Sequence, residues 1–209
     1  MVMNGDFNST TQRAAAIYDD FSKDYPLFKG HYGKPKSIVA SPLMNYTGIT
    51  GIYAPFTREA NLNTAVLPQT LPVTMLHEMA HQRGFAQEDY CNFIAYLAST
   101  YSTDPDFRYS GDLLALAHTS QALAKADYQT LLALNQTIDP AVMRDIKQNN
   151  AFWKSYEGSI EKASTSLNNH YLKANGVTDG VQSYGRMVDL LLAYYEKTTP
   201  LSSNQQNAH

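Results

Sequence analysis

With 209 residues, of which 44% are hydrophobic, the chain is long enough to form one domain with a sizeable core. Its net charge of −3 and the lack of any lysine- or arginine-rich block disfavour a phosphate-binding surface, so nucleic acid is not an expected partner. The single cysteine, Cys91, excludes an internal disulfide and a cysteine-based zinc cage, and no apolar run reaches the roughly eighteen residues of a transmembrane helix.

The amino-terminal part of the chain is predicted to hold a helix followed by a small sheet. Apolar residues recur at helical spacing over residues 11–25, until Pro26 and Gly30 end the pattern. Residues 36–64 then change character, because short β-branched and aromatic runs are separated by prolines and glycines. This pattern predicts the strands of a small antiparallel sheet.

Two further helices are predicted after the sheet. The first opens near Pro72, with Thr70 as its candidate N-cap, and ends at Gly84, since proline suits a first helical turn and glycine suits the residue after a helix. The second covers residues 87–101 and ends before Asp104-Pro105.

The rest of the chain is predicted to be helical. Helical patterns cover residues 110–135, 140–149, 152–174 and 183–197. The sequence therefore predicts an α+β fold that is mostly α, in a single domain over residues 1–209. The sheet and the site-bearing helices are expected in about 1–103, a helical subdomain in about 104–197, and a frayed tail in 198–209.

The sequence His77-Glu78-Met79-Ala80-His81 is an HExxH motif inside the helix that opens near Pro72. Histidines four residues apart project from one helical face, about a turn apart, so both imidazoles can reach one metal ion. Glu78 lies at the edge of that face, where it is expected to act as general base on a zinc-bound water and then to carry the proton to the leaving amine. The motif on a helix that follows a sheet indicates a zinc metallopeptidase, with Zn²⁺ as cofactor.

A catalytic zinc ion needs a third protein ligand and an open position. Metzincins place a histidine where this chain has Gln87, and glutamine is a poor zinc ligand. A gluzincin takes a glutamate from the following helix, which favours Glu88, with Asp89 or a distant residue as alternatives. Asn92 lies one turn after Glu88 and is expected to hydrogen-bond a zinc histidine through its side-chain oxygen.

The segment HEMAHQRGFAQED, followed by NFIAYLA, resembles an uncharacterised group of bacterial membrane proteins that carry an HExxH domain of unknown function. The resemblance extends upstream to MNYTGITGIYAPFTREANLN and downstream to HYLKANGVTDGVQSYGRMVDLLLAYY, and so covers most of the chain. It implies a zincin-like peptidase domain on the extracytoplasmic face of a bacterial membrane, held by an anchor that lies outside this sequence. Members of the group tend to have EDEANF here, so Tyr90 replaces a second glutamate and is not expected to be an essential ligand.

Zincins commonly hold an extended peptide against an edge strand above the metal. Residues 59–64, shortly before the HExxH helix, are the candidate for this strand, although an ordinary hairpin arm is an equal alternative. Four residues are therefore expected to contact the peptide: Ala60, Asn61, Leu62 and Asn63.

A side chain that stabilises the oxyanion of the tetrahedral intermediate is also expected. Tyr184, which opens the last predicted helix after a glycine-rich loop, is the favoured candidate, with Arg186 and His170 as alternatives.

The leading hypothesis is a zinc metalloendopeptidase that acts on peptides or proteins outside the cytoplasm. The alternative is a catalytically silent zincin fold that serves as a binding or sensing domain of a bacterial membrane protein. Glu78 favours the enzyme, because a scaffold has no physical need of a general base beside its zinc histidines. A purely structural zinc site is disfavoured, because no fourth protein ligand is evident.

Overall fold

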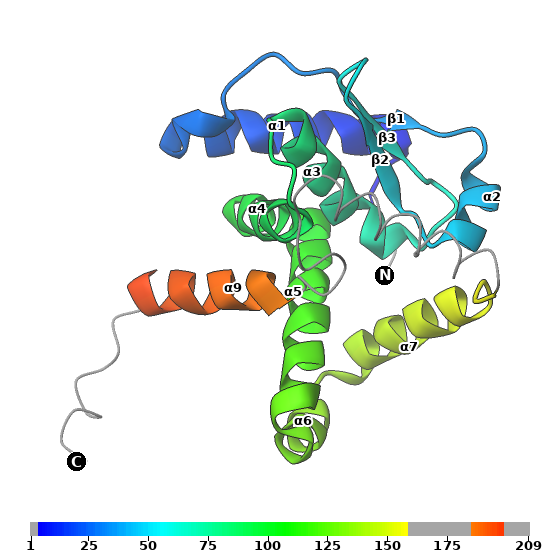
Figure 1. Ribbon diagram of the computed structural model, residues 1–209, viewed down its shortest axis with the longest axis vertical. Coiled ribbons are helices and arrows are strands. Elements are labelled where there is room, and N and C mark those ends of the chain that lie inside the picture. The colour runs from blue at the N-terminus through cyan, green and yellow to red at the C-terminus, as the bar shows by residue number, and fades with distance from the viewer. Residues whose placement is uncertain (1–3, 159–184, 199–209) are drawn as a thin grey trace.

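The computed structural model describes residues 4–158 and 185–198, which are mostly helical with three short strands (Figure 1). The helices are α1 (Phe7–Asp24), α2 (Ser41–Met44), α3 (Leu71–Gln82), α4 (Glu88–Tyr101), α5 (Pro105–Ala126), α6 (Tyr128–Asn135), α7 (Pro140–Lys154) and α9 (Gly185–Thr198). The strands are β1 (Lys36–Ser37), β2 (Gly51–Ala54) and β3 (Glu59–Leu62), and short 3-10 helices cover Pro26–Phe28, Asn45–Thr47 and Pro68–Thr70. None of the helices within these described ranges is both long and apolar enough to cross a membrane.

The three strands form a mixed sheet, so the prediction of an antiparallel sheet was wrong for one of its two pairings. The central strand β3 runs antiparallel to β2, with Gly51 opposite Leu62, and parallel to β1, with Lys36 opposite Asn61. The segment between β1 and β2 folds into α2 and a 3-10 turn instead of a hairpin. This connection lets β1 pair on the far side of β3 and in the same direction, as a crossover does.

Helix α3 lies at the centre of the fold, where it contacts β2 and β3 as well as α1, α4 and α5 (Figure 1). Large side chains of α3 share one core with side chains of α1, β3, α4 and α5. This core contains Tyr18, Phe21, Leu62, Met75, Leu76, Met79, Ile94 and Phe107. Inside this core the Tyr18 hydroxyl donates a hydrogen bond of 2.7 Å to the carbonyl of Leu76. The backbone of α3 is therefore fixed from several sides, which is the support that a precise site requires.

The end of α3 agrees with the prediction, and its start agrees in part. Gly84 has a φ of 95°, and its N–H donates to the His81 carbonyl (3.0 Å), while the N–H of Phe85 donates to the Ala80 carbonyl (3.4 Å). These two bonds form a Schellman motif, which closes the helix. Thr70 occupies the N-cap position, but its hydroxyl donates to the carbonyl of Leu67 (2.8 Å) and does not cap the helix.

The carboxy-terminal helices correct the predicted boundaries. Residues 110–135 are not one helix, because Asp127 ends α5 and caps α6, its carboxylate accepting from the N–H of Thr130 at 3.0 Å. In contrast, α7 continues across the predicted gap at residues 150–151. Most of the helix predicted over 152–174 lies outside the described residues, whereas α9 agrees with the last predicted helix to within two residues.

Candidate metal centre

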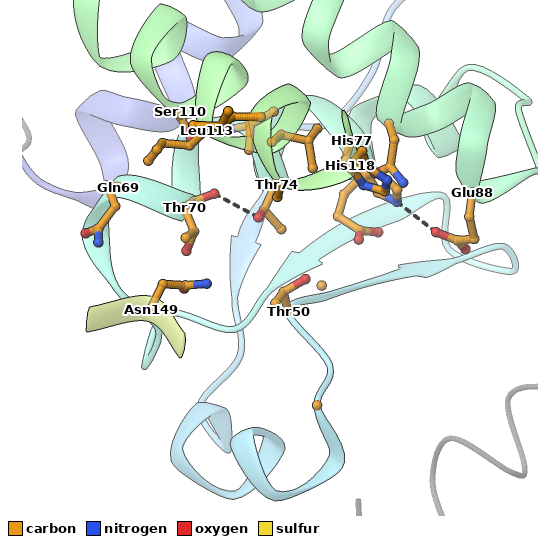
Figure 2. Close-up of a pocket in the computed structure, with 18 of the residues that line it drawn as sticks. Thr50, Gln69, Thr70, Thr74, His77, Glu88, Ser110, Leu113, His118 and Asn149 are labelled. Atoms are coloured by element: carbon orange, nitrogen blue, oxygen red, sulfur yellow. Dashed lines mark hydrogen bonds and ion pairs between the residues drawn. The ribbon is translucent and has the colours of Figure 1, made fainter. Parts of the chain in front are cut away.

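Helices α3 and α4 bring the side chains of His77, His81 and Glu88 to one point. Figure 2 shows His77 and Glu88 facing each other. The Nε2 atoms of the two histidines lie 3.1 Å apart. The Glu88 carboxylate lies 3.1 Å from Nε2 of His77 through Oε2 and 3.6 Å from Nε2 of His81 through Oε1. Within the described part of the chain, this is the group of histidine, cysteine and acidic side chains that is close enough to share a metal ion.

The arrangement of these three side chains fits zinc. Ligand atoms about 2.0–2.2 Å from one zinc ion lie about 3.3 Å from one another at the corners of a tetrahedron. The 3.1 Å between the two histidine Nε2 atoms and the 3.1 Å between Nε2 of His77 and Oε2 of Glu88 are close to that value, while the second carboxylate oxygen, Oε1, lies 3.6 Å from Nε2 of His81. Two histidines and one glutamate with a vacant fourth corner form a donor set of catalytic zinc sites. The alternative ligand Asp89 is buried in α4 and is not part of the group.

Both histidines are oriented through their other ring nitrogen. Nδ1 of His77 lies 2.8 Å from Oδ1 of Asn92, which is the contact predicted for Asn92, and Nδ1 of His81 lies 2.8 Å from the carbonyl of Phe85. Because these oxygens can only accept, each Nδ1 carries the hydrogen and donates it. The Nε2 atoms are then the ones that offer a lone pair to a metal. The buried thiol of Cys91 lies 3.3 Å from the same Nδ1 of His81.

Glu78 lies between the histidine-bearing face of α3 and strand β2. Its side chain is only 4% exposed, and its Oε2 has no hydrogen-bond partner among the described residues. Gly51 of β2 packs against it so closely that a Cβ at that position would lie 2.7 Å from Cγ and Cδ of Glu78. Burial raises the pKa of Glu78, although the nearby His77 and His81 act to lower it. A raised pKa suits a carboxylate that must take up a proton and return it.

The charges of the three clustered side chains are coupled. Burial opposes the charged form of Glu88, but hydrogen bonds from His77 and His81 hold the pKa of its carboxyl well below the usual range. Burial also opposes the charged form of His81, yet its contacts with Cys91 and Glu88 raise the pKa of this imidazole to about 11. In the metal-free chain a proton on His81 is thus the natural partner of the Glu88 carboxylate.

The cluster opens into a cleft of about 1490 Å³, lined by α3, β2 and parts of α4, α5, α6 and α7 (Figure 2). Pockets for drug-sized molecules occupy about 300–1,000 Å³. The cleft therefore has room for a longer ligand such as a stretch of polypeptide.

The strand predicted to hold a substrate is not the one beside the cluster. Ala60, Asn61 and Leu62 lie in β3, which is the central strand and is paired with β1 and β2 on its two edges. Ala60, Leu62 and the following Asn63 are fully buried, and none of the four residues lines the cleft. The expected edge position is contradicted, because the pairing of β1 with β3 places this strand in the middle of the sheet. The structure agrees with the alternative, an ordinary hairpin arm, in which β3 pairs with β2.

The strand with an edge on the cleft is β2, which sequence reasoning missed. The Thr50 carbonyl accepts from the N–H of Asn63 at 2.9 Å, so the backbone of Thr50 faces β3. Alternation along an antiparallel strand then turns the N–H and C=O groups of Gly51 and Tyr53 toward the other edge. No strand of the described ranges pairs with this edge. The ring of Tyr53 also stacks on His81, with centroids 6.2 Å apart and planes 14° apart.

Residues 3–192 match a family described as a protein of unknown function, DUF3810. The chain belongs to the DUF3810 family. The search of curated proteins and the search of solved structures found no match. The family description names no activity, so the chemistry of this DUF3810 chain has to be inferred from its residues.

The predicted oxyanion-stabilising residue is not placed. Tyr184 and the alternative His170 of this DUF3810 chain lie outside the described residues. Arg186 belongs to α9, which packs against α4 and α5, and it is not among the residues that line the cleft. His118 of α5 does line the cleft (Figure 2), although no sequence pattern singled it out, because its proximity depends on how α5 crosses α3.

Proposed function

We propose that the protein is a zinc-dependent metallopeptidase in which Glu78 is the general base. The observation that carries this proposal is the convergence of His77, His81 and Glu88, whose ligand atoms lie within 4.8 Å of one another, beside the buried Glu78. Glu78 lies on the same helix as both histidines, and its Oε2 has no hydrogen-bond partner within the described ranges. Burying a carboxylate without a hydrogen-bond partner costs free energy, so the position of Glu78 supports a catalytic role at this point of the cleft.

Zinc held by His77, His81 and Glu88 would supply a Lewis acid that polarises the scissile carbonyl and lowers the pKa of a water molecule to about 7. The Glu78 carboxylate accepts a proton from the attacking water, whose oxygen bonds to the carbonyl carbon. Burial, which raises the pKa of Glu78 in the metal-free chain, favours its protonated form until the C–N bond breaks. Glu78 then donates the proton to the leaving nitrogen, so that one water molecule is consumed for each bond cleaved.

The substrate is proposed to be an extended peptide that pairs with the edge of β2. The outward backbone groups of Gly51 and Tyr53 offer donors and acceptors for a further strand, and this edge passes directly beside Glu78. The resemblance to bacterial membrane proteins supports a location on the extracytoplasmic side of a membrane, so peptides or proteins of that compartment are the proposed substrates.

The test compares the native chain with Glu78→Gln and with Glu157→Gln, an exposed glutamate that serves as a matched control. Zinc content and hydrolysis of a broad peptide library are measured for all three. We expect one zinc ion per chain in each protein, with hydrolysis lost by about 10²–10⁴-fold only in Glu78→Gln. Zinc without turnover in the native chain would contradict the peptidase and favour a silent zinc-binding domain. A native chain that binds no zinc would overturn both.

A further inference from the structure

The cleft continues from the metal centre along α3 to the 3-10 turn that precedes this helix. Two amide side chains from different elements line this far end, Gln69 of the Pro68–Thr70 turn and Asn149 of α7. Figure 2 shows both of them at the end of the cleft opposite Glu88. Neither residue has a part in holding zinc or in moving a proton.

Both amides carry a buried polar atom that the fold does not satisfy. Gln69 is 3% exposed, yet its Nε2 has no hydrogen-bond partner among the described residues, and the same holds for the buried Oδ1 of Asn149. Buried polar side chains in folded proteins are nearly always paired, so an unpaired one calls for an explanation.

Three hydroxyl groups around this end of the cleft are engaged within the fold. The Thr70 hydroxyl donates to the carbonyl of Leu67 (2.8 Å), and that of Thr74 donates to the carbonyl of Thr70 (2.8 Å). The Ser110 hydroxyl accepts from the N–H of Val73 at 3.1 Å. The fold thus satisfies these three hydroxyls, whereas the unpaired atoms of the two amides have no partner among the described residues and are available to a ligand.

We infer that Gln69 and Asn149 form a subsite for the main chain of an extended peptide. The Nε2 of Gln69 is a donor and the Oδ1 of Asn149 is an acceptor, and a peptide offers the complementary carbonyl and N–H groups at every residue. In an extended chain the N–H and C=O of one residue point to the same side, so one residue can reach a donor and an acceptor together. This inference rests on the proposed function, because the peptide is the one whose scissile bond lies at the metal centre.

The position of the subsite sets a length requirement. Thr70, next to Gln69, lies seven residues before His77, which corresponds to about 10 Å along the helix axis at about 1.5 Å per residue. An extended peptide covers that distance with about three residues at about 3.3 Å each. The subsite therefore holds a peptide group three or four residues from the scissile bond. The enzyme should then prefer substrates that extend at least that far on one side, and should act poorly on dipeptides and tripeptides.

The test uses terminally blocked random-sequence peptides of two to eight residues as the probe. Two measurements are made: binding to the zinc-loaded Glu78→Gln protein, and kcat and KM for hydrolysis by the zinc-loaded chain with Glu78 intact. We expect affinity to rise by about tenfold, the effect of two hydrogen bonds, once the peptide reaches the subsite. Gln69→Met together with Asn149→Leu should abolish this step and raise KM for long peptides, with kcat for short ones unchanged. N-methylation of the peptide three or four residues from the scissile bond should also abolish it.

Gln148→Ala is the matched control, because Gln148 is exposed on α7 next to Asn149 and does not line the cleft. The paired Met and Leu substitutions remove unpaired polar atoms and should not lower Tm. If affinity still rises with peptide length in the double variant, the subsite is wrong. It is also wrong if a native chain that hydrolyses peptides shows no such rise. Neither result would contradict the proposed peptidase activity. A zinc-loaded native chain that hydrolyses no peptide would instead refute the proposed function.

Discussion

Among single residues, the contact between Glu78 and Gly51 is the one most directly tied to the proposed chemistry. A methyl group at position 51 would lie 2.7 Å from Cγ and Cδ of Glu78, so Gly51→Ala must displace the carboxylate. We expect hydrolysis to fall by about a hundredfold, with zinc content unchanged, because a displacement of about 1 Å at a catalytic group has such an effect. Gly33→Ala is the control, since a Cβ there meets nothing within 4 Å. Equal activity of the two variants would contradict the assigned role of Glu78.

Asn92 is expected to act on zinc through the orientation of His77. Its Oδ1 accepts from Nδ1 of His77 at 2.8 Å, and loss of such a contact commonly weakens metal binding by about 10–100-fold. Asn92→Leu should show this loss in a competition titration against a chelator, whereas Asn92→Asp, which keeps an accepting oxygen, should retain most of the affinity. If both variants bind zinc as tightly as the native chain, His77 does not depend on Asn92.

Residues whose role follows from spacing along one helix were predictable from the sequence. His77, Glu78 and His81 lie about one turn apart on one helix, and Asn92 follows Glu88 by four residues on the next. Within each helix, their relative positions are set by helix geometry. Gly51, Tyr53 and Gln69 were not predictable as members of the site. Their places depend on contacts between a strand or turn and a distant helix, which local periodicity does not encode.

At the level of elements, the turn between α3 and α4 positions the third candidate ligand. It has the positive φ of Gly84, 95°, and the Schellman bonds that bring Glu88 back beside the histidines. Gly84→Ala should destabilise the chain by about 1–2 kcal/mol, because a Cβ is disfavoured at such a φ. It should also weaken zinc binding. Urea unfolding with and without a chelator measures both effects. If the metal-free variant is as stable as the metal-free native chain, the positive φ at position 84 does not disfavour alanine as argued.

The order of the strands was the part of the fold that the sequence concealed. Residues 36–64 carry strand-forming runs, but β1 is only two residues long and pairs in parallel with β3. Whether β3 is an edge or a centre depends on that short pairing, which leaves no periodic signal. The helices were easier to predict, although the break at Asp127 was missed, because an Asp that caps α6 resembles any polar residue on the surface of a longer helix.

For the molecule as a whole, zinc binding should be coupled to proton release. The pKa of His81 is raised to about 11 in the metal-free chain, so the imidazole is protonated at neutral pH. Since Nε2 must lose its proton before it can bind a metal, zinc affinity should increase as pH rises through the neutral range. Calorimetric titration at pH 7 in buffers of different ionisation enthalpy should detect the release of about one proton per zinc ion. Zinc binding without proton release would contradict a protonated His81 in the metal-free chain.

Zinc should also stabilise the whole chain, because it would join α3 to α4 across the turn at Gly84. A ligand that binds only the folded state, at a hundred times its Kd, adds about 2.7 kcal/mol. Thermal unfolding of the zinc-loaded protein should therefore show a Tm that rises with free zinc and falls on addition of a chelator. His81→Ala should remove most of the dependence of Tm on free zinc. If the Tm of the native chain does not change with zinc concentration, the metal does not bind between α3 and α4.

The proposed zinc site is tested most directly by X-ray absorption at the zinc edge of the purified, zinc-loaded protein. We expect one zinc ion per chain with two imidazole nitrogens at about 2.0–2.1 Å and oxygen ligands at about 2.0–2.2 Å. A sulfur ligand at about 2.3 Å would assign the metal to Cys91 instead. That result, or zinc without two imidazole ligands, would contradict a centre built from His77, His81 and Glu88.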